Sequence, residues 1–224
     1  MLSHARVVDK KHYVVIKQAL SADACELLAT YAHFKANVKA ISNRSRSSDP
    51  LKDIHREYGD LMIEALFETV TPLVERATGR ELWPTLSFYY TYKNGNQLKK
   101  HKDRSSCQLV AGLYIGADDD YKTSNASWPL YLNVEGQPEA VALDVGDLVI
   151  FNGHETEHWR EPFTGTWFVS AIFGFVDKQG PFAFQKYDQR VSLGKPHIGM
   201  FRWLYGCIKQ KICSSGISEV YHWK

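Results

Sequence analysis

The first third of the chain alternates apolar and polar positions with a helical period. Residues 27–34 place apolar side chains three and four positions apart, and Ser21 precedes them where a helix N-cap is expected. Residues 54–74 keep a 3.6-residue period, and Gly79 is suited to end that helix. We therefore predict two helices with a core-facing side. Short apolar runs typical of strands precede them at 7–8 and 13–16.

From residue 82 the pattern changes to short apolar and aromatic runs. Turn-forming sequences such as Asn94-Gly95 and Gly136-Gln137-Pro138 separate these runs, and strands and helices do not alternate. Helices followed by many short strands indicate an α+β protein, mostly β, in which a sandwich or barrel is supported by helices on one face. A further helix is compatible with 200–211. The predicted strands are 86–92, 108–115, 128–134, 140–143, 147–151 and 167–176.

The composition is that of an ordinary globular protein and disfavours several classes. Of the 224 residues, 44% are hydrophobic, enough for a sizeable core. Lys and Arg number 27 against 25 Asp and Glu, and this net charge of +2 disfavours nucleic acid as a partner. No apolar run approaches the roughly 20 residues of a membrane span, so no membrane partner is expected. Four Cys without framework spacing, and no hydrophobic leader at 1–6, lead us to expect a cytoplasmic protein.

Two clusters in the strand-rich half carry candidate chemistry. His101 and Asp103 are two residues apart, so in a strand both side chains project from one face. His158 follows the apolar run that ends at Phe151. Two His and one carboxylate form the facial triad of non-haem Fe(II) oxygenases, which leaves the opposite metal positions open. We predict that these three side chains converge on one metal ion, although His-x-Asp taken alone recurs by chance.

A second pattern overlaps His158. The residues His154-Glu155-x-x-His158 match the zinc metalloprotease motif, which would make the protein a zinc metallohydrolase. That motif operates on a helix, where residues four apart share a face. Here it follows a strand-like run and Gly153, and Pro162 stops a helix soon afterwards. We therefore favour the oxygenase interpretation, and the Pro162 context favours His158 over His154 as the distal ligand.

The full motif order is Tyr92, Gly95, His101-Lys102-Asp103, Gly146-Asp147, His158 and Pro162. This order resembles the prolyl-4-hydroxylase-like branch of the 2-oxoglutarate/Fe(II)-dependent oxygenases, and the chain is similar to poorly characterised microbial members from about 75 to 188. The resemblance implies a double-stranded β-helix, a cupin-like jelly roll with helices packed on one sheet. We expect a single domain, 1–224. Its expected parts are mainly helical support in 1–81, a catalytic core in 82–190 and a C-terminal extension in 191–224.

The resemblance also implies an oxidative reaction. Fe(II) would be held by His101, Asp103 and His158, with 2-oxoglutarate as cosubstrate, O2 as oxidant and ascorbate as an optional addition. The implied activity is hydroxylation of an amino-acid, peptidyl or small-metabolite substrate, with release of succinate and CO2. Tyr92 or Tyr90 is expected to add a hydroxyl group to the cosubstrate site, and at least one of them has the alternative role of a buried sheet aromatic. A non-catalytic jelly-roll binding module is the alternative outside the enzymes, and the oligomeric state is left open.

The expected cosubstrate anchor departs from the pattern of the family. In collagen-type prolyl hydroxylases a Lys some ten residues after the distal His binds the C5 carboxylate of 2-oxoglutarate, and Trp167 stands in its place here. Trp cannot form an ion pair with a carboxylate. Arg160, two residues past the distal His, is the first candidate because a guanidinium binds a carboxylate with two hydrogen bonds. The alternative for Arg160 is a salt bridge with Glu161, and Arg104 is the second candidate anchor.

Overall fold

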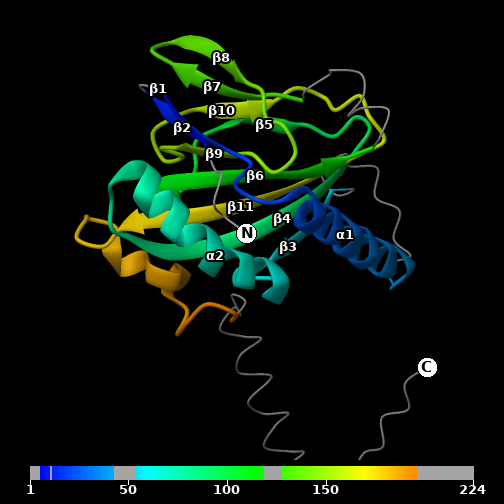
Figure 1. The fold of residues 1–224 in the computed structure, drawn as a ribbon, viewed down its shortest axis with the longest axis horizontal. Helices are drawn as coiled ribbons and strands as arrows, with labels where there is room; N and C mark the ends of the chain where they lie inside the picture. The colour runs from blue at the N-terminus through cyan, green and yellow to red at the C-terminus, as the bar shows by residue number, and fades with distance from the viewer. Residues whose placement is uncertain (1–5, 11, 43–53, 119–127, 196–224) are drawn as a thin grey trace, which may run out of the picture.

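The computed structural model describes residues 6–10, 12–42, 54–118 and 128–195, and its strands form two antiparallel sheets (Figure 1). The order is β1-β2-β9-β6-β11-β4-β3 in the larger sheet and β5-β10-β7-β8 in the smaller one. The larger sheet contains β1 (Arg6–Lys10), β2 (Tyr13–Lys17), β3 (His55–Tyr58), β4 (Leu82–Lys93), β6 (Leu109–Ala117), β9 (Leu148–Phe151) and β11 (Trp167–Asp177). The smaller sheet contains β5 (Leu98–His101), β7 (Leu130–Val134), β8 (Gln137–Val141) and β10 (His158–Arg160).

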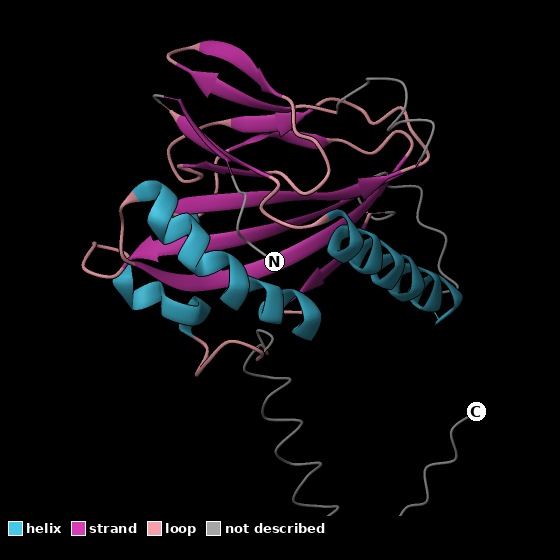
Figure 2. Cartoon of the chain, in the orientation of Figure 1, coloured by secondary structure: helices cyan, strands magenta, loops and turns pink. Residues whose placement is uncertain are grey.

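The two long helices pack on one face of the larger sheet, and the smaller sheet packs on its other face (Figure 2). Strand β11 shows how this layering arises, because alternate residues of a strand point to opposite faces. Phe173 and Phe175 pack against Phe67 of α2, whereas Phe168 and Ile172 belong to the apolar cluster between the sheets. The helical elements are α1 (Ala22–Ser42), α2 (Leu61–Thr78) and the short 3-10 segments η1 (Ser105–Cys107) and η2 (Ala183–Gln189).

Local sequence explains both ends of α2. The Asp60 carboxylate accepts a hydrogen bond from the backbone N–H of Met62 at 3.0 Å, which satisfies one of the free donors of the first turn. At the other end Gly79 adopts a φ of 66°, and its N–H donates to the carbonyl of Glu75 at 2.8 Å. The prediction that this helix ends at Gly79 is confirmed.

The predicted start of this helix was wrong. Residues 55–58 form β3, an edge strand that pairs with β4 and places Tyr58 opposite Phe88. Gly59, with a φ of 62°, separates this strand from the helix cap at Asp60. Apolar residues four positions apart, at 54 and 58, satisfy the helical period and the strand period alike, so only the pairing with β4 decides between them.

The remaining strand predictions are confirmed apart from their ends. Strand β8 covers Gln137–Val141 instead of 140–143, because the turn before it is formed by Glu135 and Gly136, with φ values of 51° and 84°. The predicted class, mostly β with helices packed on one sheet, is confirmed. The predicted helix at 200–211 lies outside the described residues. Within the described ranges, no helix combines the length and apolar character that a membrane crossing requires.

Candidate metal centre

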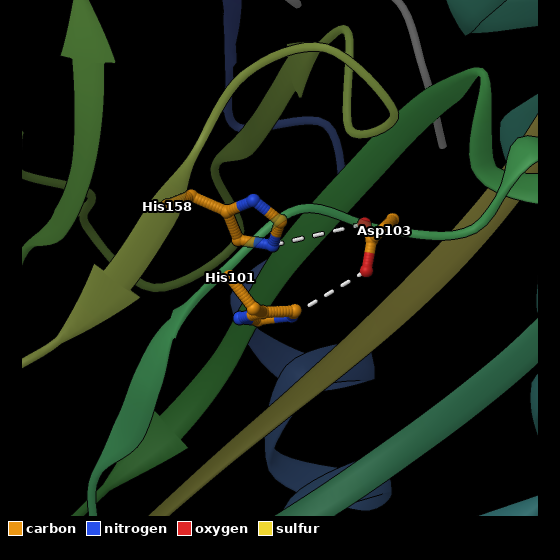
Figure 3. Close-up of side chains that lie close together, drawn as sticks. All are labelled: His101, Asp103 and His158. Carbon is orange, nitrogen blue, oxygen red and sulfur yellow. Dashed lines mark ion pairs between the residues drawn. The ribbon is translucent and has the colours of Figure 1, made fainter.

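His101, Asp103 and His158 lie together beside the space between the two sheets (Figure 3). His101 ends β5, Asp103 follows in the next loop, and His158 begins β10. Strands β5 and β10 are antiparallel neighbours in which His158 lies opposite His101, and their ring centroids are 4.3 Å apart. One potential ligand atom from each of the three side chains lies within 4.8 Å of the others. Strand pairing therefore brings together residues that are far apart in sequence.

Main-chain contacts orient both imidazole rings. The Nδ1 atoms of His101 and His158 hydrogen-bond the carbonyl oxygens of Lys99 at 2.7 Å and of Thr156 at 3.0 Å. The Nε2 atoms therefore face the Asp103 carboxylate, at 3.5 Å from Oδ1 for His101 and 3.7 Å from Oδ2 for His158 (Figure 3). A carbonyl that accepts the Nδ1–H fixes the tautomer in which Nε2 can bind a metal ion.

The three groups differ in burial and therefore in acid–base behaviour. The hydrogen bond to Asp103 raises the pKa of His101, against the opposing effect of partial burial. Burial lowers the pKa of His158, whose side chain is only 5% exposed. The side chains of His101 and Asp103 are 38% and 22% exposed, so the cluster meets solvent on their side. A metal ion would complete this cluster by displacing the proton that Asp103 favours on His101.

The absence of a side chain at Gly153 leaves space for the Asp103 carboxylate. Asp103 donates its backbone N–H to the carbonyl of Gly153 at 2.9 Å. A Cβ atom at Gly153 would lie 2.6 Å from Oδ2 of Asp103 and 2.5 Å from Cγ2 of Val110, closer than real contacts allow. The close approach of these two loops therefore requires glycine at position 153. From the sequence, Gly153 was recognisable only as the residue that precedes His154.

The Gly146-Asp147 motif has a structural role. Gly146 adopts a φ of 90°, and a side chain there would collide with the carbonyl of Leu20. The fully buried Asp147 carboxylate accepts hydrogen bonds from the Gln18 backbone at 3.0 Å and from the Lys17 ammonium group. These contacts fasten the start of β9 to the end of β2, and thereby hold the strand that leads to the His158 loop.

A cavity adjoins the three side chains. Arg160 reaches it from β10; its guanidinium lies 4.8 Å from the ring centroid of Trp128 and 5.0 Å from that of Phe168, and Nη1 donates to the carbonyl of Trp128. Burial raises the pKa of Tyr92 to about 12, so its hydroxyl keeps its proton and remains a donor. The cavity is lined by the polar residues Tyr90, Tyr92, Arg160 and Ser170 among apolar ones such as Val149 and Ile172.

Three other candidates from the sequence lie elsewhere. Arg104 does not line the cavity, and its Nη2 donates to Asp188 at 2.7 Å. His154 lies in the turn before β10, where its Nδ1 is 3.2 Å from the carbonyl of Asp103, so the zinc metalloprotease pattern is not on a helix. The ring of Trp167 packs edge-on against His33 of α1, with 4.4 Å between centroids.

The alignment that placed Trp167 at the anchor position needs correction. Strand alternation turns Trp167 toward α1 and Phe168 toward the space between the sheets, where Phe168 stacks on Tyr114 at 4.5 Å. The inward-facing residue at this point of β11 is therefore Phe168, which also has no charge. Ser170, two residues further along the same face, also lines the cavity, which the sequence analysis did not predict.

Comparisons with known proteins find similarity at the level of structure. No protein-family model and no curated protein matches the sequence. Among solved structures, a Pseudomonas putida prolyl-4-hydroxylase is 17% identical, with a TM-score of 0.55 over 76% of this chain and 95% of that one. The viral collagen prolyl hydroxylase of Paramecium bursaria Chlorella virus-1, in its 2-oxoglutarate complex, is 15% identical, with a TM-score of 0.53 over 75% and 97%.

A third neighbour has a different chemistry. The non-haem α-ketoglutarate-dependent carbocyclase SnoK from nogalamycin biosynthesis is 14% identical, with a TM-score of 0.57 over 84% of this chain and 89% of that one. One fold therefore serves hydroxylases and a ring-forming enzyme, so the fold does not define the reaction outcome. The structural neighbours agree with the predicted resemblance, and the chain has the fold of the 2-oxoglutarate- and Fe(II)-dependent oxygenases.

Proposed function

We propose that the protein is a 2-oxoglutarate- and Fe(II)-dependent dioxygenase that hydroxylates an amino-acid, peptidyl or small-metabolite substrate. The observation that carries the proposal is the convergence of two imidazole Nε2 atoms and one carboxylate beside a cavity, in the fold of these oxygenases. This donor set fits Fe(II), because two nitrogens and one oxygen on one side leave the opposite positions open. The bound iron would supply the oxidising chemistry, with O2 consumed and 2-oxoglutarate converted to succinate and CO2.

The residues of the chain would hold and orient the reactants. His101, Asp103 and His158 would bind the metal ion, with the Nδ1 carbonyl contacts keeping both rings in position. Arg160 would bind the C5 carboxylate of 2-oxoglutarate, because it brings a buried guanidinium to the cavity. Tyr92, which keeps its proton at neutral pH, would donate a further hydrogen bond.

The walls of the cavity would keep water from the reaction. Val149, Phe151 and Ile172 line it with apolar surface from strands β9 and β11. A largely apolar wall strengthens the charge-assisted hydrogen bonds inside and limits side reactions with solvent. We include in this proposal the double-stranded β-helix as the topology of 82–190, with 1–81 as its support in one domain and 191–224 as an extension.

Metal and cosubstrate binding test the proposal directly. Wild-type protein is expected to bind one Mn(II) in the absence of O2, to bind 2-oxoglutarate only when the metal is present, and to form succinate slowly with Fe(II) and O2. Asp103→Ala should abolish all three, because the carboxylate contacts both imidazoles. Asp23→Ala, at an exposed position in the first turn of α1, is the matched control and should behave as wild type.

The contrary results are equally specific. An Asp103→Ala variant with normal metal binding and succinate formation would remove this residue from the site. Wild-type protein that binds Zn(II) but not 2-oxoglutarate would favour the metallohydrolase alternative. Failure to bind either metal ion or 2-oxoglutarate would favour a non-catalytic binding module.

A further inference from the structure

A row of aromatic rings leads from the cavity to the edge of the larger sheet. Tyr90 and Tyr92, which line the cavity, stack with 5.6 Å between ring centroids, and Phe88 stacks on Tyr90 at 5.8 Å. Tyr58 of the edge strand β3 contacts Phe88 edge-on at 5.0 Å. Phe88, Tyr90 and Tyr92 alternate along β4 and therefore share one face, and Tyr58 lies opposite Phe88 in the β3–β4 register. Phe88 and Tyr58 are only partly buried, so the row continues outside the cavity, where the guanidinium of Arg190 lies 5.2 Å from the ring centroid of Tyr58.

Two arginines flank this aromatic row. Arg56 is exposed, lies opposite Tyr90 in the β3–β4 register and shares a face of β3 with Tyr58, whereas Glu57 alternates to the other face. Arg104 follows the predicted metal ligand Asp103 directly, and its side chain is 58% exposed. Arg56 therefore lies beside the aromatic row on the sheet, and Arg104 lies beside the metal cluster.

Asp188 connects Arg104 to the aromatic row. Its Oδ2 accepts hydrogen bonds from Nη2 of Arg104 at 2.7 Å and from the hydroxyl of Tyr58 at 2.8 Å. The Asp188 side chain is only 8% exposed, whereas that of Arg104 is mostly exposed. Asp188 therefore fixes one edge of a guanidinium that otherwise faces solvent next to the metal cluster.

The backbone around Asp188 is held in an unfavourable conformation. Tyr187, Asp188 and Gln189 adopt φ values of 54°, 54° and 60°, a left-handed region that residues with a Cβ rarely occupy in succession. The next residue, Arg190, is fastened by a buried ion pair with Glu64 at 3.1 Å and by a hydrogen bond to the carbonyl of Tyr187 at 2.8 Å. Strain of this kind persists where the surrounding structure imposes it, often at functional sites.

We propose that Arg104 and Arg56 bind an anionic group of the substrate, a carboxylate or a phosphate, whose aromatic or apolar body packs on the row formed by Tyr58, Phe88 and Tyr90. Guanidinium groups bind such oxyanions with two parallel hydrogen bonds, and aromatic faces bind planar apolar bodies. Asp188 is a positioning residue that keeps Arg104 in place. The inference rests on the proposed function, because it concerns the substrate that would react at the metal cluster.

Matched small probes test this anion site. Phenylacetate, phenyl phosphate and uncharged phenylacetamide are titrated by calorimetry into full-length protein holding Mn(II) and saturating 2-oxoglutarate, without O2. Saturating 2-oxoglutarate prevents the probes from occupying the cosubstrate position. At least one anion should bind ten or more times more tightly than the amide, and comparison of the two anions identifies carboxylate or phosphate as the preferred group.

Variants assign the preference to particular residues. Arg104→Gln and Arg56→Gln should each reduce the anion-to-amide preference at least fivefold, whereas Arg76→Gln, an exposed control on α2, should leave it unchanged. Asn also tolerates a left-handed backbone, so Asp188→Asn should keep the local fold. It should lower the anion-to-amide preference without changing the affinity for the amide or for 2-oxoglutarate. Asp188→Glu should show a higher anion-to-amide preference than Asp188→Asn, because it keeps the carboxylate. A merely structural role of Asp188 would not predict this difference.

The outcomes separate the anion site from the proposed function. Equal binding of the three probes, no binding of any probe, or an unchanged preference in Arg104→Gln would overturn the anion site while metal and 2-oxoglutarate binding stand. Loss of metal and 2-oxoglutarate binding in wild-type protein would instead contradict the proposed function. In that case the same probe ratios, measured without cosubstrate, still decide whether the two arginines select an anion.

Discussion

The guanidinium of Arg160 offers the sharpest test of how the cavity would hold 2-oxoglutarate. The residue is 9% exposed and its guanidinium lies over the rings of Trp128 and Phe168, so its position is constrained on several sides. Arg160→Gln removes the charge and keeps a polar side chain of comparable direction. Arg160→Lys keeps the charge and removes the two-pronged geometry. The two variants therefore separate the contribution of the charge from that of the geometry.

The expected loss follows from the kind of hydrogen bond involved. A hydrogen bond to a charged group contributes about 1.5–3 kcal/mol, and a charged pair in a buried site lies toward the upper end. Loss of the guanidinium should therefore weaken 2-oxoglutarate binding by about 2–3 kcal/mol, roughly a 30- to 150-fold rise in Kd. Arg160→Lys should lose less, about tenfold, because a single ammonium group still attracts the carboxylate.

Calorimetric titration of 2-oxoglutarate into the Mn(II)-loaded protein without O2 measures this loss. Circular dichroism and an unchanged Mn(II) affinity serve as controls that each variant is folded and that its metal cluster is intact. If folded Arg160→Gln bound 2-oxoglutarate within twofold of wild type, the C5 carboxylate would have to be held by another group, and the assignment of Arg160 would be wrong.

Three further predictions concern the metal cluster and the C-terminal part of the described chain. Gly153→Ala should weaken Mn(II) binding at least tenfold, because the added Cβ displaces the Asp103 carboxylate. Arg190→Met should lower the free energy of unfolding in urea by about 3 kcal/mol, since it leaves the Glu64 carboxylate buried without its cation. Mn(II) affinity should fall as the pH drops through the pKa of His101, which Asp103 raises, because the protonated imidazole cannot bind a metal ion.

Each of these predictions has a matched comparison. The double substitution Glu64→Leu with Arg190→Met should lose less stability than Arg190→Met alone, since no unpaired charge remains buried; an equal loss would show that packing is responsible. Normal Mn(II) affinity in Gly153→Ala would mean that the loops can separate at no cost. A metal affinity that did not change with pH across the range in which imidazoles titrate would show that His101 does not bind the metal ion.

Several features of the fold and of the candidate site could be predicted from local sequence. The period of α2 and its end at Gly79 follow from interactions between residues a few positions apart, which any chain with that sequence would make. The two-residue spacing of His101 and Asp103 correctly predicted that they lie together, although Asp103 lies in the loop just after β5 and not in the strand itself. The order of helices and strands likewise predicted two layers with helices on one face.

Tertiary structure decided the features that depend on a partner strand or on distant loops. Pairing with β4 made 55–58 a strand, and the alternation of β11 placed Phe168 instead of Trp167 next to Arg160. The contact between Arg104 and Asp188 joins residues 84 positions apart, so no local pattern marks it. The physical reason is common to all of these cases. A local pattern shows that a side chain lies on one of two faces, but only the pairing and packing of the whole chain determine what that face meets.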